Sequence, residues 1–244
     1  MTVDRAKEII DRLDTSGIPV IASIKKAQIT GPRLGIFSSS FNPPTTAHVE
    51  LIRLATDTFS LDEILALAGK TNADKTAYDC QLEDRVAMLE LTFAEQPRIS
   101  IGISSHAFYV DILEALYLKY PAQTDLHFIV GFDTFERVLD FGDQYSKRFH
   151  RAFKGRTEAL SFLFSKSTFI VAGRAGAGAE RVELLVRREK AVPPDRVKYL
   201  DFPDDLGDLS ATEVRRRLRE GLSIKGLVPA AVEKYIKYHA IYSS

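Results

Sequence analysis

Several features that define other classes of protein are scarce or missing in this 244-residue chain. It has a single cysteine, Cys80, which cannot form an internal disulfide and therefore favours a reducing compartment. Its apolar runs all fall short of the roughly 20 residues that span a bilayer. The N-terminal residues also lack the apolar core of a signal peptide. We therefore expect a cytoplasmic protein that does not act at a membrane.

An excess of charge of either sign is also missing. Lys plus Arg and Asp plus Glu both number 33, so the formal net charge is zero. Such a chain has no overall field that would attract nucleic acid or an anionic membrane, although local cationic sites remain open to it. We expect small-molecule partners and no nucleic acid, and we leave homo-oligomerisation open.

What the chain does contain is a regular alternation of short apolar runs and helical patterns. Residues 3–13 form an amphipathic helix pattern, and residues 1–33 are interpreted as a helical N-terminal extension. Six strands are then predicted, at residues 34–37, 64–68, 99–103, 126–130, 168–172 and 197–200. This alternation favours an α/β fold, a Rossmann-like doubly wound parallel sheet over residues 34–244. Two helices within residues 212–242 form a helical C-terminal cap.

The first predicted strand ends in an unusual polar run, Ser-Ser-Ser-Phe-Asn-Pro-Pro-Thr-Thr-Ala-His, at residues 38–48. Ligands of such sheets bind beyond the carboxyl ends of the strands. Thr45 or Thr46 can cap the following helix, whose free N–H groups suit an anion, and His48 falls in its first turn. His48 could then donate to a phosphoryl oxygen as charge builds on it. The alternative is a turn before an ordinary capped helix.

A second polar run begins a helix near the end of the chain. Ser210 and Glu213 have the spacing of a capping box. Thr212 adds a hydroxyl and Arg215 a guanidinium, which together suit a polyphosphate. The alternative is a plain capping box followed by a solvated arginine run at 215–217.

Other candidates are weaker individually. Gly131 and Asp133 follow the strand at 126–130, where an acid can accept from ribose hydroxyls. Arg174 follows the strand at 168–172, where exposed backbone could read an adenine edge. The glycines after this strand lack the Gly-Lys-Ser/Thr ending of a P-loop, so a P-loop is rejected. Lys75 and Arg85 are either phosphate contacts or surface residues.

Together, three motifs resemble one family: Phe-Asn-Pro-x-Thr-x-x-His at 41–48, Gly-x-Asp at 131–133, and Ser-x-Thr-x-x-Arg at 210–215. Their order is similar to that of the nucleotidyltransferase superfamily with the H/T-x-x-H signature. Within it, the chain most resembles nicotinamide and nicotinate mononucleotide adenylyltransferases. Residues 72–75 and 130–134 are similar to the fungal-type branch in particular. The resemblance covers residues 34–242.

The resemblance implies transfer of AMP from ATP to nicotinamide mononucleotide or its nicotinate analogue, with release of pyrophosphate. Thr45, His48 and Arg215 would be the catalytic residues, with His48 steadying the transition state. Mg²⁺ would act as cofactor through phosphate oxygens and water, without protein ligands. The substrate-binding and ATP-binding residues would be Ser39, Ser40, Phe41, Lys75, Arg85, Gly131, Asp133, Arg174, Ser210 and Thr212. The alternatives are a nucleotide-binding or regulatory protein with decayed catalysis, and a transferase acting on another phosphorylated substrate.

Two departures from the family concern the acceptor more than ATP. Ser38 and Ser39 stand where the family usually has glycine, so their side chains could crowd a substrate or bond to it. Because the chain has no tryptophan, a stacking partner for a pyridine ring must be Phe or Tyr. Phe132, Phe135 and Phe141 are the candidates.

Overall fold

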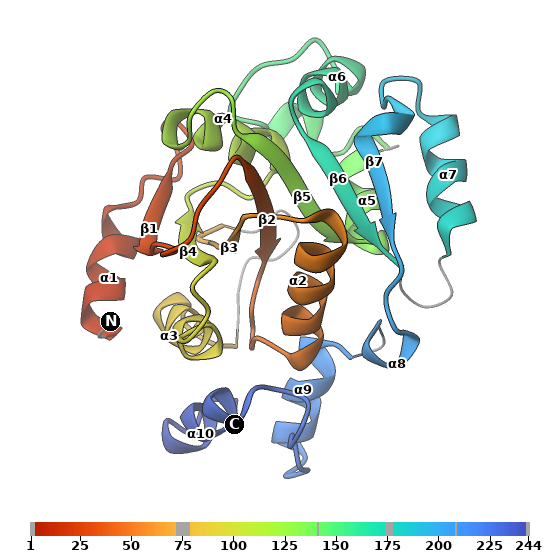
Figure 1. The fold of residues 1–244 in the computed structure, drawn as a ribbon. Helices are drawn as coiled ribbons and strands as arrows, with labels where there is room; N and C mark the ends of the chain where they lie inside the picture. Colours follow the sequence, from red (N-terminus) through yellow and green to blue (C-terminus); the bar gives the residue numbers. More distant parts are fainter. Residues whose placement is uncertain (1–2, 72–78, 141, 174–177, 208, 243–244) are drawn as a thin grey trace.

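A seven-stranded sheet forms the centre of the molecule, with strand order β1-β4-β3-β2-β5-β6-β7 (Figure 1). The computed structural model describes residues 3–71, 79–140, 142–173, 178–207 and 209–242. The six predicted strands are confirmed as β2 (Arg33–Ser39), β3 (Glu63–Gly69), β4 (Ile99–Ser104), β5 (Asp125–Gly131), β6 (Thr168–Ala172) and β7 (Val197–Leu200). These six pair in parallel, so the predicted fold class is confirmed.

Helices cover both faces of this sheet, which explains why its inner strands are almost continuously apolar. One face packs against α1 (Val3–Arg12), α2 (Thr46–Phe59) and α3 (Leu82–Thr92). The other packs against α4 (Tyr109–Lys119), α5 (Phe132–Leu139), α6 (Arg156–Lys166) and α7 (Ala179–Arg188). Short helical turns at Ser146–Arg148, Pro194–Arg196 and Asp204–Gly207 complete the connections. Among the described residues, no helix has both the length and the apolar character needed to cross a membrane.

The strand order reverses between β2 and β5. The chain runs from β2 outward through β3 to β4, and β5, β6 and β7 are then added on the opposite side of β2. The loops that leave β2 and β5 therefore diverge at the carboxyl edge of the sheet, which is where doubly wound folds bind ligands.

The residues before β2 add an element that the sequence did not predict. Besides the predicted helix, they form β1 (Ile21–Lys25), which pairs with β4 in the antiparallel direction. Lys70, at the end of β3, donates from Nζ to the carbonyls of Ile10 at 2.6 Å and Leu13 at 2.7 Å. This side chain ties the end of α1 to the carboxyl edge of the sheet.

The predicted C-terminal pair of helices is present as α9 (Ala211–Arg219) and α10 (Ala230–Tyr238). They share a small apolar core with Met88 of α3, contributed by Val214, Ile224, Val228, Val232 and Ile236. Figure 1 shows this cap beside α2 and α3. Leu227 lies between α9 and α10, and its carbonyl accepts the N–H of Thr46, at the start of α2, at 3.0 Å. The cap is thus attached to the first turn of the helix that follows β2.

Candidate active site

The turn between β2 and α2 is buried and held from several sides. Phe41 has a left-handed backbone (φ 45°), and Phe41 and Asn42 are 0 % and 3 % exposed. Arg85 on α3 donates from Nη1 to the Ser40 carbonyl at 2.8 Å and is itself 2 % exposed. This contact supports a role for Arg85 in holding the turn. Its direct contact with a phosphate stays a prediction.

Thr45 and His48 cap α2 reciprocally. The Thr45 hydroxyl accepts from the His48 N–H at 3.4 Å, and the Thr45 N–H donates to His48 Nδ1 at 2.9 Å. This is a capping box in which histidine takes the place of the usual glutamate or glutamine. The ordinary capped helix that was the alternative interpretation therefore exists, and His48 is part of its cap.

The same contact determines the tautomer of His48. Because a backbone N–H can only donate, Nδ1 must be the acceptor, and the neutral ring carries its proton on Nε2. Nε2 lies 3.5 Å from the Ser39 hydroxyl at the end of β2. The ring also packs against Phe37 and Phe41, with centroids 5.7 and 5.3 Å away. The cap thus fixes the ring and leaves Nε2 as a hydrogen-bond donor.

Arg215 connects the C-terminal helical cap to the turn between β2 and α2. Its Nη1 donates to the Asn42 carbonyl at 2.7 Å, across 173 residues of sequence, and its Nη2 donates to the Thr212 hydroxyl at 3.3 Å. Ser210 caps α9, accepting from the Glu213 N–H at 3.2 Å. The structure therefore brings together the predicted residues at the starts of α2 and α9.

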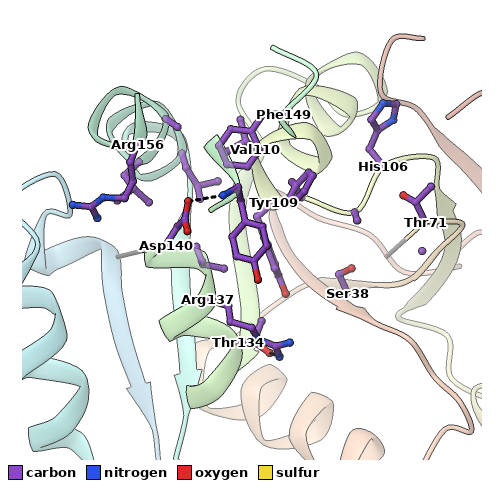
Figure 2. A pocket seen from close by; sticks show the side chains of 18 of the residues that line it. Ser38, Thr71, His106, Tyr109, Val110, Thr134, Arg137, Asp140, Phe149 and Arg156 are labelled. Atoms are coloured by element: carbon purple, nitrogen blue, oxygen red, sulfur yellow. Dashed lines mark hydrogen bonds between the residues drawn. The ribbon is translucent and has the colours of Figure 1, made fainter. Parts of the chain in front are cut away.

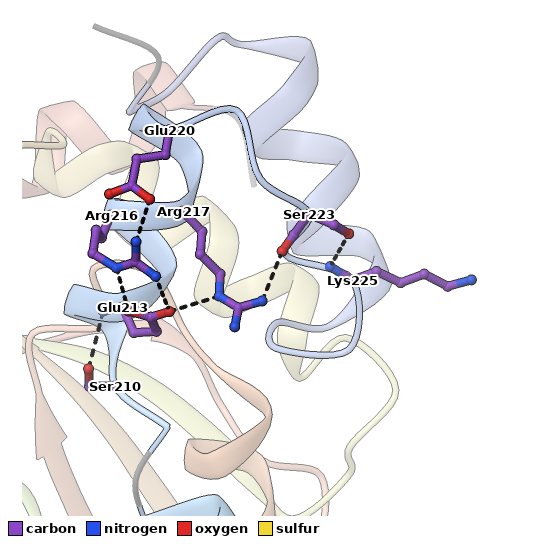
Figure 3. Close-up of polar contacts among 7 residues, drawn as sticks. All are labelled: Ser210, Glu213, Arg216, Arg217, Glu220, Ser223 and Lys225. Carbon is purple, nitrogen blue, oxygen red and sulfur yellow. Dashed lines mark hydrogen bonds and ion pairs between the residues drawn. The ribbon is translucent and has the colours of Figure 1, made fainter.

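The two arginines that follow Arg215 make contacts within the C-terminal cap, which Figure 3 shows. Arg216 and Arg217 both bond to the carboxylate of Glu213, which lowers the pKa of Glu213 to about 2. Their side chains are 46 % and 39 % exposed, whereas that of Arg215 is 11 % exposed. The solvated-face interpretation therefore holds for Arg216 and Arg217 and is wrong for Arg215.

A carboxylate already lies against Arg215. Asp79 Oδ2 is 2.8 Å from Arg215 Nε and 3.7 Å from Arg219 Nη1. The Asp79 side chain is 51 % exposed, so water screens this pair and a stronger anion can displace it. Asp79 could not be predicted from the sequence, because nothing local marks it as a partner of α9.

The candidates on the other side of the strand reversal are less enclosed. Gly131 is the N-cap residue of α5, and Asp133 is exposed in the first turn of that helix. These positions are compatible with contacts to a ribose, which stay a prediction. Lys75 and Arg174 lie outside the described residues.

A cavity of about 300 Å³ opens beside these residues at the carboxyl edge of the sheet (Figure 2). Hydroxyls enter it from β2 and from the residues after β3 and β5, and aromatic rings enter from the starts of α4 and the 140–156 segment. Its polar lining includes Ser38, Ser39, Ser40, Thr71, Thr134, Arg137, Asp140 and Arg156. The two departures from the family pattern, Ser38 and Ser39, both line this cavity. They are consecutive residues of β2, and the Ser39 hydroxyl lies 3.5 Å from His48 Nε2.

The aromatic lining differs from the sequence prediction. Phe132 and Phe135 are 2 % and 0 % exposed in the core and do not line the cavity. Phe141 is outside the described residues. Phe108, Tyr145 and Phe149 line the cavity instead. Their signal in the sequence was weak: one follows the strand at 99–103, and the others lie in an aromatic-rich loop with no motif.

Buried polar contacts fix the walls of this cavity. The carboxylate of Asp140 accepts from the N–H groups of Gln144 at 2.7 Å and Tyr145 at 2.9 Å. Arg156 pairs with the buried Glu189 and donates to the Leu139 carbonyl at 2.9 Å. His106, also in the lining, has a lowered pKa because of its burial and the nearby His150. The cavity is thus preformed, with hydroxyl donors beside aromatic faces.

Comparison with known proteins identifies the family. Residues 36–217 match the model of the cytidylyltransferase-like family, so the chain belongs to that family. Two relatives are named probable nicotinate-nucleotide adenylyltransferase. That of Salinibacter ruber is 30 % identical over 86 % of this chain and 97 % of its own length. That of Synechococcus is 31 % identical over 86 % and 94 %.

Solved structures agree with the fold. The nicotinic acid mononucleotide adenylyltransferase of Plasmodium falciparum, in complex with NaAD, has a TM-score of 0.63 and 17 % identity. The match covers 87 % of this chain and 98 % of that one. A complex of the same enzyme with APC gives a TM-score of 0.61. At this identity the likeness concerns the fold. None of these comparisons supports the expected link to the fungal-type branch.

Proposed function

We propose that this chain transfers AMP from ATP to nicotinate mononucleotide, or to its amide analogue, giving the dinucleotide and pyrophosphate. The observation that carries the proposal is the convergence of Thr45, His48 and Arg215 on the buried Asn42 turn. Two helix N-termini and a guanidinium there form a site for a polyphosphate. The names of the relatives supply the acceptor.

In the proposed reaction, an oxygen of the acceptor's 5′-phosphate attacks the α-phosphorus of ATP. The new O–P bond forms as the bond between the α-phosphorus and the bridging oxygen breaks, and pyrophosphate leaves with that electron pair. His48 would donate from Nε2–H to a phosphate oxygen as negative charge builds on it. Ser210, Thr212 and Arg215 would hold the β- and γ-phosphates. Catalysis then consists of positioning and charge stabilisation, without a covalent enzyme intermediate.

The ribose and adenine of ATP and the acceptor would bind along the carboxyl edge of the sheet. Gly131 and Asp133 would contact the adenosine ribose, and Arg174 would lie near the adenine. The acceptor would occupy the cavity, where Phe108, Tyr145 and Phe149 offer ring faces. Ser39, Ser40 and Phe41 would border both substrates, and Lys75 would contribute a phosphate contact.

Mg²⁺ would accompany ATP as part of the substrate. Within the ranges that the structure describes, no three His, Cys, Asp or Glu side chains are grouped to hold a metal ion. We propose that phosphate oxygens and water supply the ligands of Mg²⁺. Cytoplasmic location remains part of the same proposal.

The second candidate function is a nucleotide-binding protein that has lost catalysis, and Ser38 and Ser39 in the cavity favour it. Thermal shift with ATP, NAD and each mononucleotide, run beside a turnover assay, separates the two. If the chain is an active enzyme, both substrates should raise its Tm and the assay should show turnover. Stabilisation by ATP or NAD without any turnover would favour the binding protein.

A further inference from the structure

Tyr242, the last described residue of the chain, contacts the turn between β2 and α2. The Tyr242 hydroxyl donates to Asn42 Oδ1 at 2.6 Å, across 200 residues of sequence. Both partners are buried, with Tyr242 6 % and Asn42 3 % exposed. A buried bond of this kind is costly to break, because the amide oxygen would lose its partner without gaining water.

Asn42 connects this tyrosine to the arginine that would hold ATP. Its side-chain oxygen accepts from Tyr242, while its main-chain oxygen accepts from Arg215 Nη1 at 2.7 Å. The bond from Tyr242 restrains the Asn42 side chain and with it the position of the Asn42 backbone, whose carbonyl is the acceptor that fixes the Arg215 guanidinium. Without that acceptor, the partners of Arg215 among the described residues are Thr212, through a longer bond, and the exposed Asp79.

The surroundings of Tyr242 keep its hydroxyl a donor. Burial and the neighbouring Cys80 raise the pKa of the phenol, so it stays protonated throughout the neutral range. The Cys80 thiol also has a pKa raised by burial, to about 11. The Tyr242 to Asn42 bond therefore keeps its direction at any pH at which the site would work.

We propose that Tyr242 is a positioning residue for ATP, which acts through Asn42 to hold Arg215 in place for the β- and γ-phosphates. The proposal rests on the proposed function for the identity of the ligand. It assigns to the C-terminal cap a part in binding ATP in addition to its apolar packing.

Tyr242→Phe tests this, because it removes one hydroxyl and keeps the ring. We expect the KM for ATP to rise about 5- to 10-fold, as for the loss of one buried hydrogen bond. The KM for the acceptor and kcat should change by less than about twofold. Tyr242→Phe keeps the Arg215 guanidinium and weakens a contact to the β- and γ-phosphates that is made equally in the ground state and the transition state. Calorimetric titration with ATP alone should show the same loss of affinity.

Tyr235→Phe is the matched control on the same cap. The Tyr235 hydroxyl donates to Asp84 Oδ1 at 2.8 Å, so the substitution removes an equivalent bond away from Asn42. If the C-terminal cap only stabilises the fold, both variants should affect ATP affinity equally, and that result would overturn the proposal. We expect a comparable small drop in Tm for both and weaker ATP binding for Tyr242→Phe alone.

A double-mutant cycle with Arg215→Ala tests the route through Asn42. Once Arg215 is absent, Tyr242→Phe should have no further effect on ATP affinity, whereas additive losses would contradict the proposal. If ATP binds and responds in this way while no acceptor is turned over, the proposed function fails and the positioning role stands. If the unmodified protein binds no ATP, both are overturned.

Discussion

The two ring nitrogens of His48 have different partners, and this division determines what the residue can do. Nδ1 accepts from the Thr45 N–H at 2.9 Å, so Nε2 carries the proton and faces the Ser39 hydroxyl at 3.5 Å. The helix cap therefore selects the tautomer that the proposed contact of His48 with a phosphate oxygen requires. A single local motif supplies both the start of α2 and a fixed donor.

His48→Ala should lower kcat by about 10²–10³, as for the loss of one donor to transition-state charge. The Thr45 hydroxyl remains to cap α2, so the protein should stay folded. Steady-state kinetics and a thermal melt check both points. His48→Gln is the control, because glutamine at this position can complete a capping box. It should recover thermal stability without recovering turnover, and unchanged turnover in His48→Ala would remove the residue from the mechanism.

Asp79 lies where the phosphates of ATP would compete for Arg215. Asp79→Asn removes the competing charge at nearly constant size, so the KM for ATP should fall by about 2- to 5-fold, a small effect because the pair is partly solvated. The fall should shrink at high salt. Glu220→Gln is a matched control, since Glu220 is similarly exposed (48 %) and pairs with Arg216. An unchanged or raised KM in Asp79→Asn would show that Asp79 does not oppose ATP binding.

At the scale of single elements, α4 contains a carboxyl group that the fold disfavours. Asp111 is 0 % exposed, and one of its oxygens accepts the His150 N–H at 2.9 Å. Its other oxygen has no hydrogen-bond partner among the described residues. Burial raises the pKa of this carboxyl to about 6, which the His150 N–H offsets only in part.

The sign of the resulting pH dependence follows from linkage. A carboxyl whose pKa is higher in the folded than in the unfolded state costs stability as pH rises from about 4 to about 6. Asp111→Asn removes this ionisation, so it should be more stable than the unmodified protein by about 1–2 kcal/mol at pH 8. The difference should nearly vanish at pH 4. Urea unfolding at both pH values measures it, and a difference independent of pH would contradict the assignment.

Most elements could be predicted from the sequence because their signals are local. The six parallel strands are short apolar runs buried on both faces, and α2 and α9 begin at recognisable caps. β1 was missed for a physical reason. Its sequence, Ile-Ala-Ser-Ile-Lys, is half-buried and mixed in polarity, and it becomes a strand only by pairing with β4, about 80 residues away.

At the scale of the whole molecule, the candidate site is assembled from distant segments. The sequence identified Thr45, His48 and Arg215 from their motifs, because capping and charge are readable locally. It could not show that Arg215 bonds to Asn42, or that Tyr242 supports the same residue. The cavity lining at 106–110 and 134–163 was also missed, because those residues share a wall only after the strands are ordered.

The balanced charge of the chain now has a structural counterpart. With a net charge of zero, anionic substrates must be attracted locally. At the turn between β2 and α2, the described residues offer the N-termini of α2 and α9 and the Arg215 guanidinium beside them. We therefore expect anion binding to be concentrated at this one turn.

A pyrophosphate-release assay with Mg·ATP tests both the proposed transfer and the role of this turn in binding ATP. The panel contains nicotinate mononucleotide, nicotinamide mononucleotide and other phosphorylated alcohols, with the dinucleotide product quantified alongside. We predict release with a pyridine mononucleotide, in equal amount to the dinucleotide formed, and loss of that release in Arg215→Ala at limiting ATP. Absence of release across the panel, with ATP still bound, would contradict the proposed transfer of AMP.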